Sequence, residues 1–373
     1  MEKYFSEKSL LKAPVERAAF SDRQAYVCAE LSRLAYYKFE GGQAIEEILQ
    51  FARPFIGEGG KYKLFEAELL SRYSDDSFDR GSALVAFKQI LNAAGFARVQ
   101  VFSRQGTQGF FCTRTFWNEA RGSKTVAYLA FRGTEPRKIA DIRTDVRATL
   151  VPQRVGDYDM HFHTGYLEEV RRVQDDILPM LERTPHQQLI VTGHSLGGAL
   201  AIVFARLHAA SVNGACYTFG APPVGTVQVQ RGFKTPIYEI INELDIVPNL
   251  PNPWLGAGAG VLLRLLRLLL KMFTVTERLL ASGSWDEKLE RYIDMMTRYR
   301  HPGYKSYLVG SGKHATLRYN LNSYDALSLW WRMIFNSRLG LRRFEKLVSD
   351  HMIDAYLDKI RVHSLDRNKQ TES

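Results

Sequence analysis

Residues 189–200 have the sequence LIVTGHSLGGAL. The first four are apolar or β-branched, which predicts a short buried strand, and a helical pattern begins at Ala199. The glycines between them permit a sharp turn, because side chains there would clash with the strand or the helix. Ser195 is therefore expected at the tip of a strand–turn–helix, at a helix N-terminus that favours developing negative charge. The G-x-S-x-G pattern at this place predicts an activated serine nucleophile.

The flanking sequence alternates between helical and strand-like periods. Helices are expected at 21–39, 82–94, 165–181 and 199–210, and strands at 99–103, 109–116, 125–131, 189–192, 215–219 and 237–241. This alternation predicts an α/β fold, with a mostly parallel sheet covered by helices on both faces. No repeat or linker divides the chain, so residues 1–373 are expected to form one domain.

Composition narrows the class of protein only a little. Of the 373 residues 45% are hydrophobic, enough for a sizeable core, and 50 Lys and Arg against 40 Asp and Glu give a net charge of +10. That balance favours anionic surfaces. The basic residues form no patch interleaved with aromatic side chains, so a nucleic-acid partner is not expected.

The three cysteines, at positions 28, 112 and 216, show neither disulfide nor metal-ligand spacing. We therefore expect no metal and no cofactor. The first residues lack the basic start and apolar run of a Sec signal peptide. We expect a cytoplasmic or peripheral membrane location, with non-classical secretion left open.

A serine nucleophile needs a base and an acid, and in this fold class both follow it in the chain. Asp245 is the best acid, because it follows a strand and precedes a loop at the strand's carboxyl end. Four histidines lie beyond it, and spacing alone does not choose among them. His351 directly precedes a helical run, which can carry it over the nucleophile, and His314, ahead of a probable strand, is the alternative. An oxyanion hole is expected from the N–H of Leu196 and from the loop after strand 125–131.

Several segments resemble class 3 (fungal-type) triacylglycerol lipases, in the α/β-hydrolase superfamily. The similarity runs in chain order through 192–200 (TGHSLGGAL), 130–134 (AFRGT), 141–145 (DIRTD), 163–166 (HTGY), 218–225 (TFGAPPVG) and 242–251 (NELDIVPNLP). The resemblance implies a lipid ester hydrolase that works through an acyl-enzyme.

The same resemblance assigns roles to individual residues. It implies Asp245 as the acid, His351 as the base and Thr134 as the second oxyanion donor. His301 resembles a family histidine that is not catalytic. For His194 we expect a packing role, with its ring pointing away from the catalytic face, and for His163 a structural or supporting role.

A leucine-rich helical stretch, 254–296, interrupts the α/β alternation, and we expect a helical lid or cap insertion at about 252–300. Arg264, Arg267 and Lys271 fall on one stripe, opposite a broad leucine face. Two interpretations stay open: membrane-interface contact through about 260–280, or a packed cap subdomain. Either favours a long-chain lipid ester as substrate.

Rival hypotheses are a short-chain esterase or thioesterase with the same triad, and a catalytically inactive lipid-binding protein. The head group of the lipid and the oligomeric state stay open.

Overall fold

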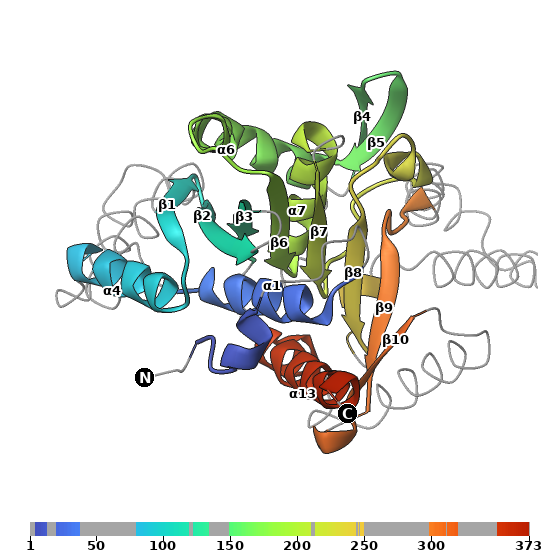
Figure 1. Ribbon diagram of the computed structural model, residues 1–373. Coiled ribbons are helices and arrows are strands. Elements are labelled where there is room, and N and C mark those ends of the chain that lie inside the picture. The colour runs from blue at the N-terminus through green and yellow to red at the C-terminus, as the bar shows by residue number, and fades with distance from the viewer. Residues whose placement is uncertain are drawn as a thin grey trace, which may run out of the picture.

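An eight-stranded sheet runs through the molecule, with helices on both of its faces (Figure 1). The computed structural model describes residues 4–12, 20–37, 80–118, 122–133, 149–209, 213–243, 245, 247–249, 298–310, 312–319 and 349–372. The predicted insertion at 252–300 therefore lies almost wholly outside the described residues. Among the described helices, none is long and apolar enough to cross a bilayer.

The strands of the main sheet follow the order β1-β2-β3-β6-β7-β8-β9-β10. Their bounds are β1 Ala97–Arg104, β2 Thr107–Asn118, β3 Gly122–Phe131, β6 Gln188–His194, β7 Gly214–Phe219, β8 Ile237–Asn242, β9 Tyr304–Val309 and β10 Thr316–Tyr319. Strands β3, β6, β7, β8 and β9 pair in parallel, whereas β1, β2 and β10 join antiparallel at the edges. The predicted mostly parallel α/β sheet is confirmed.

Helices α1 (Asp22–Leu34), α4 (Arg80–Ala93) and α13 (Ile353–Glu372) pack on one face of the sheet. Helices α6 (Thr164–Glu182) and α7 (Leu196–His208) cover the other face. The second part of strand β3, residues 126–131, is apolar throughout because the sheet is covered on both faces there. Tyr128 and Ala130 belong to the core under α1, while Leu129 and Phe131 belong to the core under α6 and α7. Each residue of 126–131 is thus buried on one side of the sheet or the other.

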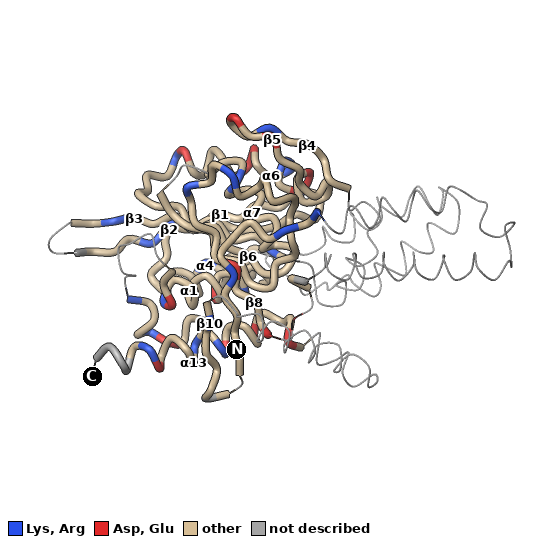
Figure 2. The backbone as a smooth tube through the Cα atoms, turned by 90° about the vertical axis from the view of Figure 1, so that its right-hand side faces the viewer, with Lys and Arg blue, Asp and Glu red and all other residues tan. Residues whose placement is uncertain are grey.

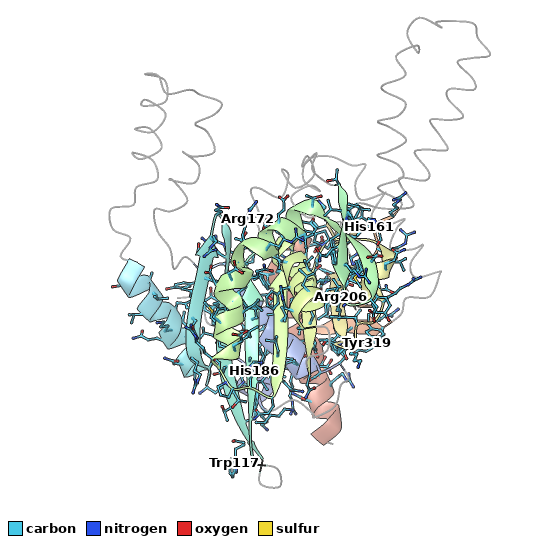
Figure 3. The ribbon with its side chains drawn as sticks, turned by 90° about the horizontal axis from the view of Figure 1, so that it is seen from above. Trp117, His161, Arg172, His186, Arg206 and Tyr319 are labelled. Carbon is cyan, nitrogen blue, oxygen red and sulfur yellow. The ribbon has the colours of Figure 1, made fainter. Side chains whose placement is uncertain are left out.

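A small hairpin, β4 (Leu150–Val155) with β5 (Tyr158–His163), was not expected from the sequence. It leads directly into α6, and Phe162 bridges to Gly225 in the loop beyond β7. Figure 3 shows this hairpin near His161, far from Trp117 at the tip of the β2–β3 hairpin. The β2–β3 tip adjoins the start of β3. Because β3, β6, β7 and β8 run in parallel, the carboxyl ends of β6, β7 and β8 lie at the opposite end of these strands.

Charged residues of both signs are interspersed along the backbone of the outer elements (Figure 2). On α6 and α13, acidic and basic residues follow one another along the same helix. The described surface therefore presents mixed charge on these helices rather than a stripe of one sign.

Candidate active site

Ser195 stands between the end of β6 and the first residue of α7, as the sequence predicts. Its backbone has φ +56° and ψ −127°, a conformation that residues with side chains rarely adopt. A Cβ on Gly193 would come within 2.2 Å of the Gly197 carbonyl oxygen, and one on Gly197 within 2.4 Å of the Phe131 carbonyl oxygen. The tight turn that raises Ser195 thus depends on these two glycines.

A row of hydrogen bonds joins Ser195 to a histidine and a carboxylate. The Ser195 hydroxyl donates to Nε2 of His351 over 2.8 Å, and Nδ1 of His351 donates to Oδ2 of Asp245 over 2.7 Å. All three residues are buried, none being more than 1% exposed. Among the four histidines considered, the structure brings His351 to the serine. His314 is exposed in the 3-10 turn Gly312–His314, and His363 bonds the backbone N–H of Leu317.

Asp245 follows β8 and is held by three donors. The first donor is Nδ1–H of His351. The other two are the N–H of Val247, which donates to Oδ1 over 2.9 Å, and the hydroxyl of Tyr356, which donates to Oδ2 over 2.5 Å. Burial and the neighbouring Asp245 raise the pKa of Tyr356 well above its ordinary value, so this phenol keeps its proton and donates. The phenol oxygen in turn accepts the N–H of Asn242, which fixes Tyr356 to the end of β8.

Gly220, just after β7, gives this cluster its space. Its φ is +59°, and a Cβ there would lie 2.7 Å from Oδ2 of Asp245 and 2.9 Å from the Tyr356 hydroxyl. The same Cβ would lie 3.2 Å from the His351 ring. A side chain at this position would press into the point where acid and base meet.

His194 has a role that the sequence did not reveal. Its ring does not point away from the catalytic residues: Nε2 donates to the backbone carbonyl of His351 over 2.6 Å. Burial, and then the proximity of His351, lower the pKa of His194 well below its ordinary value, so the ring is neutral. Nδ1 therefore accepts the hydroxyl of Tyr36 over 2.9 Å, and burial raises the pKa of Tyr36 so that this hydroxyl stays protonated. The ring that was expected to point away and pack instead holds the backbone of His351.

Leu196 is the first residue of α7, so its N–H has no carbonyl partner in its own helix. That position fits the predicted first oxyanion donor. Thr134, the predicted second donor, lies outside the described residues. The described chain ends there at Gly133, where a Cβ would meet the Tyr36 hydroxyl at 2.2 Å. His163 occupies the N-cap position of α6 without a side-chain capping hydrogen bond, and its ring stacks on Tyr166 with 4.0 Å between ring centroids, consistent with a structural role.

The described part of the chain contains no group of three or more His, Cys, Asp or Glu residues that could hold a metal. The three cysteines are free and buried. Burial raises the pKa of the Cys28 thiol to about 12 and of the other two thiols well above their ordinary value. These thiols are therefore protonated core side chains.

Part of the chain is similar to a known protein family. Residues 128–254, which carry Ser195 and Asp245, match the family described as "Lipase (class 3)". The resemblance to class 3 lipases is thereby confirmed for this segment of the α/β fold.

Particular relatives are similar over smaller shares. A lipase of Rhizomucor miehei is 34% identical over 156 residues, 37% of this chain and 41% of that protein. Phospholipase A1-II 1 of Oryza sativa subsp. indica is 35% identical over 95 residues, 23% of each chain. Among solved structures, lipase II from Rhizopus niveus is 21% identical, with a TM-score of 0.40 over 60% of this chain and 71% of that one. The chain thus spans less than half the length of either curated relative.

Proposed function

We propose that this chain hydrolyses carboxylic esters of lipids, with Ser195 as nucleophile, His351 as general base and Asp245 as the acid that orients the base. The observation that carries the proposal is the unbroken row of hydrogen bonds from the Ser195 hydroxyl through His351 to Asp245. The match of residues 128–254 to class 3 lipases supports it independently.

In the first half of the reaction, Nε2 of His351 takes the Ser195 proton as Oγ attacks the ester carbonyl carbon. The carbonyl oxygen becomes an oxyanion, which the N–H of Leu196 and the N-terminus of α7 stabilise. Thr134 is the proposed second donor. When the tetrahedral intermediate collapses, the C–O bond to the alcohol breaks and Nε2–H of His351 protonates the departing oxygen.

In the second half, water attacks the acyl-enzyme after giving a proton to His351. The bond from the carbonyl carbon to Ser195 Oγ breaks, His351 returns the proton to Oγ, and the fatty acid leaves. Throughout, Asp245 accepts Nδ1–H of His351, which keeps the ring in the tautomer whose Nε2 faces Ser195.

The lipid class rests on the sequence. The leucine-rich stretch that follows the acid in the chain favours a long acyl chain, and we propose that residues 260–280 contact a membrane interface. We propose a cytoplasmic or peripheral membrane location for the protein. The relatives carry names of both lipid classes: a triacylglycerol lipase from Arabidopsis thaliana is 27% identical over 33% of this chain, beside the rice phospholipase. The proposed substrate is therefore a long-chain lipid ester, with the head group to be assigned by experiment.

The test is product analysis by mass spectrometry on mixed vesicles of phospholipid and triacylglycerol, comparing the wild type with Ser195→Ala. The proposal expects free fatty acid from the wild type only, and the accompanying lysolipid or diacylglycerol names the head group. Equal release by both proteins, together with equal vesicle binding, would instead support an inactive lipid-binding protein. A parallel series of chromogenic esters separates a lipase from a short-chain esterase, because the latter loses activity as the acyl chain lengthens.

A further inference from the structure

A second buried histidine–carboxylate pair lies beside the catalytic acid. Nδ1 of His301 contacts Oε2 of Glu239, and Oε1 of Glu239 accepts the N–H of Gly303 over 2.6 Å. His301 is 9% exposed and Glu239 2%. Glu239 belongs to β8, the strand that leads to Asp245, and His301 stands three residues before β9.

The other ring nitrogen of His301 points to the loop of the catalytic acid. Nε2 lies 2.5 Å from the backbone carbonyl of Pro248, which can only accept, so Nε2 carries a proton. Nδ1 faces a carboxylate. Burial alone would raise the pKa of Glu239, but the charge and hydrogen bond of His301 lower it below its ordinary value. The ring is therefore held between two partners, Glu239 at Nδ1 and the Pro248 carbonyl at Nε2.

Other charged or titratable groups surround this pair. Lys305 and Tyr307 from β9 and Cys216 from β7 interact with Glu239, and Arg300 lies close enough to Lys305 to lower its pKa, after the larger effect of burial. Lys305 adds positive charge on the side of the carboxylate. It therefore reinforces the ionised state of Glu239.

The backbone around His301 is itself fixed, which gives the ring one orientation. The carbonyl of His301 accepts Nε2–H of Gln230 over 2.8 Å, and the N–H of Arg300 donates to the carbonyl of Gly225 over 2.8 Å. Gly303 leaves room for the carboxylate, because a Cβ there would lie 2.8 Å from Oε1 of Glu239. The pair is thus a built site rather than a chance contact.

Pro248 connects this pair to catalysis. It lies in the 3-10 turn Val247–Asn249, whose first N–H, that of Val247, donates to Oδ1 of Asp245. The turn is therefore held at one end by Asp245 and at the next residue by His301. If the Pro248 carbonyl loses its donor, the turn that orients Oδ1 of Asp245 can shift, and the angle at which Oδ2 meets His351 changes with it.

We propose that His301, held in place by Glu239, is a positioning residue for the catalytic acid. Its Nε2–H fixes the turn after Asp245 and thereby the direction in which Asp245 holds the ring of His351. Pro248 and His301 stand in the chain on either side of residues 250–297, so the same bond ties these two flanks together. This inference rests on the proposed function.

The kinetic test compares His301→Asn with Glu239→Gln on a soluble chromogenic ester. Asparagine is too short to contact Glu239 and Pro248 at once, so we expect kcat to fall about ten- to a hundredfold with little change in KM. Glu239→Gln leaves the ring of His301 in place, with Nε2 still donating to Pro248, so its kcat should fall less. His208→Gln is the matched control: a partly buried histidine on α7 that bonds Gln174, and it should stay within about twofold of wild type.

A double variant, Glu239→Gln with His301→Phe, covers the case in which His301→Asn does not fold. It leaves no unpaired buried charge and keeps the ring volume, while removing the donor to Pro248. We expect its kcat to match or fall below that of His301→Asn. Melting temperatures show whether each protein is folded at the assay temperature.

The structural readout is the downfield proton resonance of Nδ1–H in His351, which reports the bond to Asp245 whether or not the protein is active. The proposal expects this resonance to shift or broaden in folded His301→Asn and to stay in place in His208→Gln. A folded His301→Asn with wild-type kcat and an unchanged resonance would overturn it. A wild type that neither hydrolyses esters nor reacts at Ser195 with a phosphonate ester sinks the proposed function instead, while the resonance still tests the positioning.

Discussion

Two buried histidine–carboxylate pairs lie along strand β8, and they differ in what faces the second ring nitrogen. In the pair of His351 and Asp245, Nε2 meets the hydroxyl of Ser195, which can give up its proton. In the pair of His301 and Glu239, Nε2 meets the carbonyl of Pro248, which can only accept. The first ring can therefore act as a base, while the second faces no group with a proton to give at Nε2 and can only hold its neighbours. Burial beside a carboxylate does not by itself make a histidine catalytic.

The sharpest way to break this comparison is Asp245→Asn. The amide can donate to Nδ1 of His351, which favours the tautomer with a proton on Nε2, so the ring no longer accepts the Ser195 proton. We expect kcat/KM on a soluble ester to fall about 10⁴-fold. Glu239→Gln makes the same chemical change in the other pair and should lose far less. Equal losses in the two variants would contradict the distinction between them.

Gly220→Ala tests how closely the first pair must be packed. The new Cβ would lie 2.7 Å from Oδ2 of Asp245 and require φ +59°, so acid and base must separate. We expect a loss in kcat of about a hundredfold. Gly156→Ala is the matched control, since Gly156 has φ +58° with nothing within 4 Å of its added Cβ. It carries the same backbone strain in open space, so its melting temperature can fall while kcat stays at the wild-type value.

His194→Phe tests whether the base also needs its backbone held. The ring volume is kept, but the donor to the carbonyl of His351 is lost, and we expect kcat to fall about tenfold, the value of one hydrogen bond. Tyr36→Phe removes only the partner on the far side of His194 and should cost less. If Tyr36→Phe reduces kcat as much as His194→Phe, then Tyr36 acts on the site directly and not through His194.

Most of the sheet could be predicted because its strands are apolar and short, and the turn at Ser195 because its glycines are local in sequence. The partners of Ser195 were harder, since Asp245 and His351 lie 50 and 156 residues further along the chain. The residues alone left His351 and His314 open, and the family resemblance favoured His351.

Other features had no local signal at all. The β4–β5 hairpin mixes Pro152, Gly156 and charged residues without a clear period of two. The bond from His194 to His351 joins a side chain to a backbone carbonyl, which any residue offers, so no sequence pattern marks it. For His301, the sequence indicated a non-catalytic role, but its two acceptors become visible only when β8, β9 and the turn at Pro248 are brought together.

The smallest expected effect concerns the acid stability of the second pair. The pKa of Glu239 is lowered in the folded protein relative to its ordinary value of 4.5, so its ionised form favours folding. This contribution is fully present above about pH 4.5 and is lost as the pH falls below it, through the lower pKa of the folded state.

The double variant Glu239→Gln with His301→Phe has neither titrating group. Subtracting its melting temperature from that of the wild type therefore cancels the titration of all other carboxylates. We expect the melting temperature of the wild type, relative to that of the double variant, to fall by a few degrees between pH 6 and pH 3. A difference that stays constant over this range would mean that the pKa of Glu239 is not lowered by folding, and a change in favour of the wild type in acid would mean that the carboxyl is protonated in the fold.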